Sequence, residues 1–129
     1  MDYGFIKELD TDFDTATSRT KEALAAEGFG ILSEIDVQNA FKEKLGVDHR
    51  RYTILGACNP GLAHKVVSAE PHIGLLLPCN VLVQESPDGN RTTVSIADPR
   101  AMFKLIDNPE IQPVAQEAEQ RLKRAMDNI

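Results

Sequence analysis

Apolar and polar positions follow two different periods along the chain, and their succession predicts the order of the elements. Strands are predicted where apolar residues alternate with polar ones or where residues that suit a pleated surface gather. Helices are predicted where apolar residues return after three or four positions. The predicted strands cover residues 3–9, 29–35, 52–57, 79–84 and 91–97. The predicted helices cover residues 13–27, 37–45, 60–70 and 113–129, with a short helical segment over 99–106.

Residues that begin and end helices stand at the boundaries of this pattern. Asp12, Asp36 and Asn59 precede predicted helices, and their side chains can accept a hydrogen bond from the N–H groups of the first turn. Pro60 suits the first helical position, because the N–H that it lacks would have no partner there. Gly28 and Gly46 end the first two helices. Pro71 stops the third helix.

Each predicted helix has one apolar side, and we expect these sides to pack on one face of a sheet. The apolar side of the first helix consists of Phe13, Ala16, Thr20, Ala23 and Leu24, and that of the second consists of Val37, Ala40, Phe41 and Leu45. The apolar side of the helix over 60–70 consists of Leu62, Ala63, Val66 and Val67. That of the helix over 113–129 consists of Val114, Ala118, Leu122, Ala125, Met126 and Ile129.

The prediction is an α+β fold, a single two-layer domain over residues 1–129 with roughly five strands and helices packed on the sheet. Its order is β-α-β-α-β-α-β-β-α, and Pro87 to Asn90 has the composition of the turn that joins the last two strands. One domain suits a chain of 129 residues. The exposed sheet face or edge favours a homodimer.

Charge and composition exclude several classes of partner. The net charge of −6 argues against nucleic acid and against anionic membrane surfaces, and residues 49–51 form the only basic cluster outside the helices. The longest apolar run, residues 73–77, is far too short to span a bilayer, and we expect no targeting segment. Two cysteines do not make a disulfide framework. We therefore expect a cytoplasmic protein with reduced thiols.

The stretch from Tyr52 to Val83 carries the candidate chemistry, because both cysteines lie in it. Cys58 ends a strand just before a capped helix, where helical N–H groups can lower the pKa of a thiol; its alternative role is that of a small buried apolar residue. Cys79 begins the next strand among apolar residues, at 75–77, 81 and 83, which raise the pKa of a thiol, so we expect Cys58 to be the more reactive of the two. If the two strands are neighbours, the thiols could form a disulfide, a metal pair or a redox switch, but that depends on the register.

Two histidines of the same stretch complete the set of candidate residues. With the two cysteines, His64 and His72 would make four zinc ligands, but their spacing matches no zinc finger or ribbon, and we predict no metal site. No motif of serine hydrolases, phosphate-binding loops, dinucleotide folds or zinc proteases occurs. The sequence therefore leans against an enzyme and indicates no cofactor. The candidate ligand-binding or reactive residues are Cys58, Asn59, Pro60, His64, His72 and Cys79.

Four segments resemble one family, that of the domains of unknown function numbered 302, found in bacteria and archaea. They are GFGILSEIDVQNAFKEKLGVD, YTILGACNP, GLLLPCNVLV and residues 98–102. The motif residues are Gly56, Cys58, Asn59, Pro60, Leu77, Pro78 and Cys79. The resemblance runs from about Tyr3 to the last helix. It implies a small α+β domain in which dimeric packing is unsurprising, and it implies no activity.

Three functions of different classes follow from these observations. The first is a non-enzymatic ligand-binding or sensor homodimer with a small-molecule site lined by Cys58, Asn59 and Cys79. The second is a thiol-dependent redox or metal-handling protein, which requires neighbouring sulfur atoms. The third is a structural or interaction domain in which both cysteines fill the core. The first is favoured.

Overall fold

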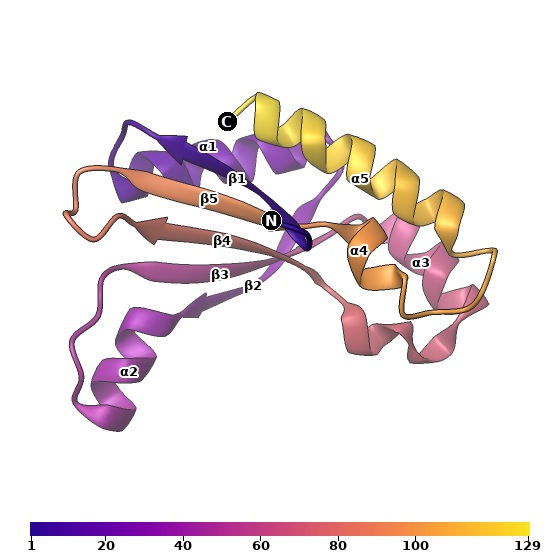
Figure 1. The fold of residues 1–129 in the computed structure, drawn as a ribbon, viewed down its shortest axis with the longest axis horizontal. Helices are drawn as coiled ribbons and strands as arrows, with labels where there is room; N and C mark the ends of the chain where they lie inside the picture. The colour runs from indigo at the N-terminus through magenta and orange to yellow at the C-terminus, as the bar shows by residue number, and fades with distance from the viewer.

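The computed structural model describes residues 1–129 and contains one antiparallel sheet of five strands. The strands are β1 (Gly4–Leu9), β2 (Gly30–Asp36), β3 (Tyr52–Cys58), β4 (Cys79–Glu85) and β5 (Thr92–Ala97). Their order across the sheet is β1-β5-β4-β3-β2. The α+β fold and the predicted order of elements are confirmed (Figure 1).

Five α-helices and one 3₁₀ helix accompany these strands, and α4 and α5 follow the last of them. The α-helices are α1 (Phe13–Ala26), α2 (Val37–Leu45), α3 (Pro60–Ala69), α4 (Pro99–Phe103) and α5 (Gln112–Asp127). The 3₁₀ helix, η1 (Pro71–Leu76), was not predicted. Pro71 does follow the end of α3 as predicted, but it also begins the next turn, because a proline is tolerated at a first helical position. No helix has the length and the apolar character needed to cross a membrane.

The predicted helix starts are confirmed by their hydrogen bonds. The Asp12 carboxylate accepts from the N–H of Thr15 at 2.7 Å, and that of Asp36 accepts from the N–H of Asn39 at 3.0 Å. Gly46 ends α2 with a φ of 65°, a left-handed conformation that costs glycine little.

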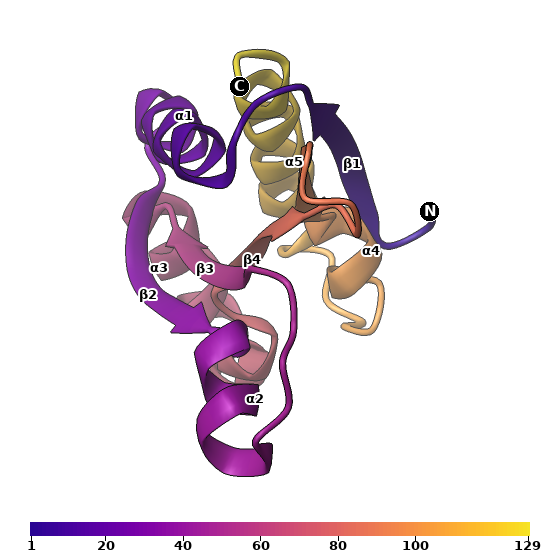
Figure 2. The same ribbon diagram turned by 90° about the vertical axis from the view of Figure 1, so that its left-hand side faces the viewer.

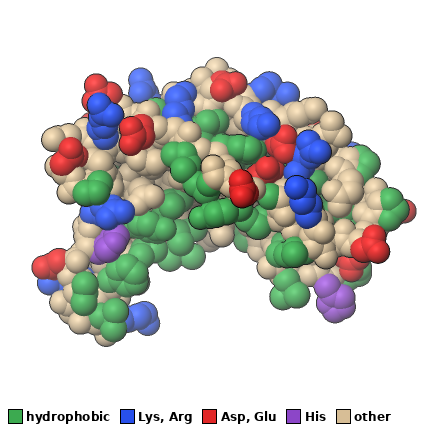
Figure 3. Space-filling view, in the orientation of Figure 1, with side chains coloured by type: hydrophobic (Ala, Val, Ile, Leu, Met, Phe, Trp, Pro, Cys, Tyr) green, Lys and Arg blue, Asp and Glu red, His purple; other side chains and the backbone are tan.

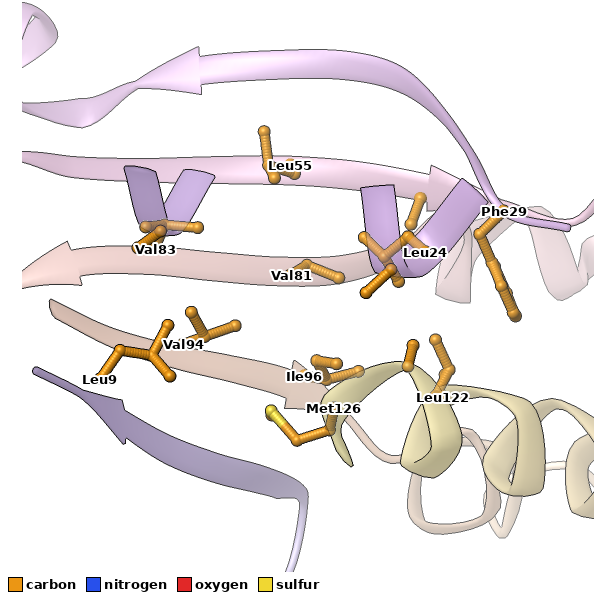
Figure 4. Packing of buried hydrophobic residues seen from close by; sticks show 14 of the residues in the cluster. Leu9, Leu24, Phe29, Leu55, Val81, Val83, Val94, Ile96, Leu122 and Met126 are labelled. Carbon is orange, nitrogen blue, oxygen red and sulfur yellow. The ribbon is translucent and has the colours of Figure 1, made fainter. Parts of the chain in front are cut away.

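The main core lies between one face of the sheet and the helices α1 and α5 (Figure 2). Leu55, Val81, Val83, Val94 and Ile96 point from the three central strands into this layer (Figure 4). The predicted apolar sides of α1 and α5 supply the other half, including Leu24 and Leu122 (Figure 4). The opposite face of the sheet has no helix packed across it (Figure 2).

The prediction for α2 is wrong in one respect. Its apolar stripe was expected to pack on the sheet, yet none of its nine residues is buried. The helix instead projects from the end of β2, away from the layer of α1 and α5 (Figure 1). The pattern of apolar residues predicts a helix and its apolar side, but it does not specify what covers that side.

A second, smaller core closes the other end of the molecule. Val66 of α3, Ile73 of η1, Phe103 of α4 and two residues of the α5 region, Ile111 and Ala115, are buried together there. This cluster anchors the helices that stand around the start of β4 (Figure 1).

Candidate functional site

The register of β3 and β4 determines where the two cysteines point. The strands are neighbours, and Ala57 lies opposite Cys79. Directly opposite residues share a face of the sheet, and successive residues alternate between faces. Cys79 therefore points with buried Ala57 toward the helices, whereas Cys58, one residue on, points to the other side. Both thiols are free and half-buried, so the two cysteines are not paired and the disulfide that the sequence left open is not formed.

A cavity of about 270 Å³ lies where β3 ends and β4 begins. Its wall is formed by residues of β3, β4, β5, α3, η1, α4 and α5. Sixteen of its twenty lining residues are hydrophobic, and none carries a charge. Cys58, Asn59 and Cys79 all line it, which brings together three of the residues that the sequence singled out.

The Asn59 side chain forms two hydrogen bonds to the backbone at the edge of this cavity. Its side-chain oxygen accepts from the N–H of Leu62 at 3.2 Å, so the predicted cap of α3 is confirmed. Its amide nitrogen donates to the carbonyl of Glu27 at 3.5 Å. A Cβ at Gly28 would lie 2.9 Å from that nitrogen, and the φ of Gly28 is 83°. Asn59 therefore joins the start of α3 to the end of α1, where only glycine fits closely.

The environment of Cys79 keeps its thiol neutral. Burial raises the pKa of Cys79 to about 12, with a smaller contribution from the negative charge of Asp98. Its sulfur donates a weak hydrogen bond to the carbonyl of Ala97 at 3.5 Å. Because the thiolate is the nucleophile, Cys79 is a poor nucleophile at neutral pH, and a metal ion would have to displace its proton in order to bind.

The ionisable groups next to the cavity form hydrogen bonds with neighbouring groups. Asp98 caps α4 by accepting from the N–H of Arg100 at 2.9 Å, and partial burial raises the pKa of its carboxyl. Glu119 of α5 accepts from Lys123 at 3.0 Å, and its pKa is lowered because hydrogen bonds from Lys123 and Asp98 outweigh its burial. Neither carboxylate lines the cavity.

The remaining candidate residues lie elsewhere. Pro60, His64 and His72 are exposed and do not line the cavity. No three His, Cys, Asp or Glu side chains gather in a way that could hold a metal ion. The four-ligand set considered from the sequence is therefore not assembled.

Sequence reasoning missed the walls that α4 and α5 contribute. Met102 and Phe103 of α4 and Val114, Ala118 and Leu122 of α5 line the cavity. Three of these belong to the apolar stripe predicted for the last helix. The signal was therefore visible, but the pattern did not place that stripe beside Cys79.

Comparison with known proteins gives a family and no activity. A family model, Domain of unknown function DUF302, matches residues 5–129. An uncharacterised protein of Aquifex aeolicus (strain VF5) is 25% identical over 111 residues, which are 84% of this chain and 71% of that protein. The crystal structure of an uncharacterised conserved DUF302 protein from Bacillus stearothermophilus superposes with a TM-score of 0.88 at 27% identity, covering 98% of this chain and 97% of that chain. The match to the family model spans nearly the whole sequence, and so this chain belongs to the DUF302 family.

Proposed function

We propose that this protein is a non-enzymatic ligand-binding or sensor domain that works as a homodimer and binds a small uncharged, mainly apolar molecule in the cavity beside Cys79. The observation that carries the proposal is the lining of the cavity, which seven elements supply and in which hydrophobic residues greatly outnumber polar ones. Small-molecule sites in proteins are usually of this kind, concave and apolar with few polar groups to fix orientation.

The lining also indicates the charge of the ligand. A carboxylate, phosphate or ammonium group would lose its hydration in the cavity and would find no lining residue of opposite charge. The polar side chains available are two amides, Asn59 and Asn80, and two thiols. Asn59 already uses its side chain as a cap. An uncharged ligand with one or two polar atoms fits this wall best.

The volume limits the size of the ligand. At about 270 Å³ the cavity lies just below the range of about 300–1,000 Å³ that holds drug-sized molecules. The ligand is therefore expected to be a short aliphatic or a single-ring or double-ring aromatic compound.

The absence of charged lining residues also favours binding over catalysis. General acid–base chemistry needs a titratable group near the operating pH within hydrogen-bond reach of the substrate. Among the lining residues only the two thiols titrate, and Cys79 remains protonated at neutral pH.

The test is binding of an uncharged fluorescent two-ring probe, 1-aminonaphthalene, to the wild type and to Ala118→Leu. Ala118 is a half-buried lining residue of α5, so three further carbon atoms there reduce the free volume of the cavity. We expect probe affinity to fall at least tenfold, while the melting temperature stays the same or rises because a void is filled.

The matched control is Ala26→Leu, which makes the same change at an exposed position of α1 outside the cavity. It should leave probe affinity unchanged. Equal binding by wild type and Ala118→Leu, or no binding of the probe to the wild type, would contradict the proposed site.

A further inference from the structure

The open face of the sheet carries an apolar row that crosses all five strands. The register aligns Ile6 of β1, Ser95 of β5, Leu82 of β4, Ile54 of β3 and Ile35 of β2 side by side. Ser95 is the one polar member. At the two ends of the row, Ile6 and Ile35 are 53% and 51% exposed. Four apolar side chains therefore lie in line on the face opposite α1 and α5.

The apolar side of α2 adjoins the same open part of the molecule. Phe41 and Leu45 lie on its stripe, and Leu45 is 70% exposed. Leu32 of β2 and Val47 after α2 are exposed as well. Figure 3 shows hydrophobic side chains gathered in the hollow beneath the sheet and along the helix that projects beside it. We call this surface, the outward side of the five strands together with α2, the open face.

The projecting helix is held in place by its own contacts. Gln38 donates to the carbonyl of His49 at 3.0 Å, and Lys42 forms an ion pair with Asp48 at 2.9 Å. The ring of His49 lies edge-on to Phe41, at 5.4 Å, and to Tyr52 of β3, at 5.9 Å. The helix is thus positioned without burying its apolar side. A nine-residue helix is too short to be stable by itself, so this packing matters.

We infer that the open face is the surface through which two copies of this chain pair about a two-fold axis. The inference rests on the homodimer of the proposed function and adds the location of its interface. A two-fold interface uses the same patch on both partners, so the patch must be complementary to itself. The open face meets this condition, because it has both a projection, α2, and a hollow beneath the sheet that can receive a projection (Figures 1 and 3).

The size of the open face suits a stable dimer. A standard interface takes about 800 Å² and about 20–30 residues from each partner. That area is roughly a tenth of the 7525 Å² of accessible surface of this chain. The outward residues of the five strands and the nine residues of α2 together number on the order of twenty, which is the number required.

The charges around α2 favour a second copy over a polyanion. Lys42 and Lys44 alternate with Glu43 on the helix, and Asp48 follows in the next loop. When two copies face each other across a two-fold axis, the positive groups of one copy can lie beside the negative groups of the other. Nucleic acid or an anionic membrane would instead require a field of one positive sign, and the whole chain has a net charge of −6.

Pairing through the face is favoured over edge pairing at β2. The ladder between β2 and β3 is irregular between Ile31 and Ser33, and such a bulge disturbs the edge that another strand would have to match. The edge therefore offers a poor template, whereas the face offers the larger apolar area.

The experiment measures mass by sedimentation equilibrium over a range of concentrations for the wild type, Leu45→Glu, Ile35→Glu and Val67→Glu. We expect the wild type to have twice the 14.2 kDa mass of one chain at tens of micromolar. Leu45→Glu and Ile35→Glu should each weaken pairing at least tenfold, because the axis brings two added carboxylates into one interface. Val67, 41% exposed on α3, lies outside the open face, so Val67→Glu should pair like the wild type.

Circular dichroism and probe binding identify which proposal fails. Each variant should keep its helix signal and its affinity for 1-aminonaphthalene. Dimers in all four proteins would overturn the open face as the interface and leave the homodimer intact. A monomeric wild type that still binds the probe would overturn both the interface and the homodimer, but not the ligand site. A monomer whose Leu45 is needed to bind a different protein would also overturn the inference.

Discussion

Cys58 and Cys79 stand one register position apart on neighbouring strands, and this single step gives them different surroundings. Cys79 shares the core face of the sheet with Ala57, where burial and the charge of Asp98 raise its pKa to about 12. Cys58 precedes the Asn59 cap of α3 and is half-buried on the cavity wall. A chemical role for a thiol in this protein therefore has to be sought at Cys58.

Alkylation with iodoacetamide should modify Cys58 before Cys79 in the native protein. At pH 7 a thiol with a pKa of about 12 is ionised to the extent of roughly 1 part in 10⁵, and only the thiolate reacts. Because a thiol ionises as the pH rises through its pKa, labelling of Cys79 should increase steadily from pH 8 to 10. Peptide mass mapping measures both sites, and Cys58→Ser gives the rate of Cys79 alone. Faster modification of Cys79 at pH 7 would contradict this order.

Local residue chemistry made some of these positions predictable and left others open. The caps Asp12, Asp36 and Asn59 depend on the two or three residues that follow each of them, so the sequence alone was sufficient. The surroundings of Cys79 depend on its pairing with β3 and β5, which are formed by residues far away in the chain. The apolar residues that flank Cys79 in the sequence did predict a raised pKa for its thiol, but its separation from Cys58 depends on the register and was not predicted.

At the scale of elements, local periodicity predicted the helices and strands well, but did not settle what each apolar side packs against. The stripes of α1 and α2 have similar spacings in the sequence. That of α1 is buried against the sheet, whereas α2 buries no residue. The difference arises because α2 leaves the end of β2 and turns away from the layer of α1 and α5 (Figure 2).

The close packing of β3 between its neighbours gives a test at this scale. A Cβ at Gly56 would lie 2.8 Å from Cγ of Pro78, and closer still to the hydroxyl of Ser33 on β2. Gly56→Ala should therefore lower the free energy of unfolding by about 1–3 kcal/mol, the usual cost of overpacking. Urea unfolding measures it.

Gly30 of β2 supplies the matched control for Gly56. It also lies in a strand, but nothing stands within 4 Å of the position of its Cβ, and its φ is not positive. Gly30→Ala should leave stability unchanged or raise it slightly, since glycine loses more chain entropy on folding than alanine. Equal losses of stability in the two variants would show that close packing at Gly56 is not the cause.

At the scale of the whole molecule, the sequence predicted the α+β fold and the succession of elements, and the similarity to the DUF302 crystal structure agrees with that fold. The cavity could not be predicted from the sequence, because it forms only when distant segments of the chain pack together. Its walls bring residues of β3 and α3 together with residues of α4 and α5 that follow tens of positions later, such as Met102 and Val114. No local period links such distant segments. The cavity and the open face therefore became visible only once the elements were assembled.

The proposed dimer should also make thermal stability depend on concentration. When folding is coupled to pairing, a tenfold rise in protein concentration stabilises the paired state by about 1.4 kcal/mol, which raises the melting temperature of a protein of this total size by roughly 3–5 °C. Scanning calorimetry of the wild type and Val67→Glu should show this rise. Leu45→Glu, whose pairing is at least tenfold weaker, should melt at a lower temperature than the wild type at each concentration at which the wild type is dimeric. The same melting temperature for the wild type at every concentration would contradict coupling between pairing and stability.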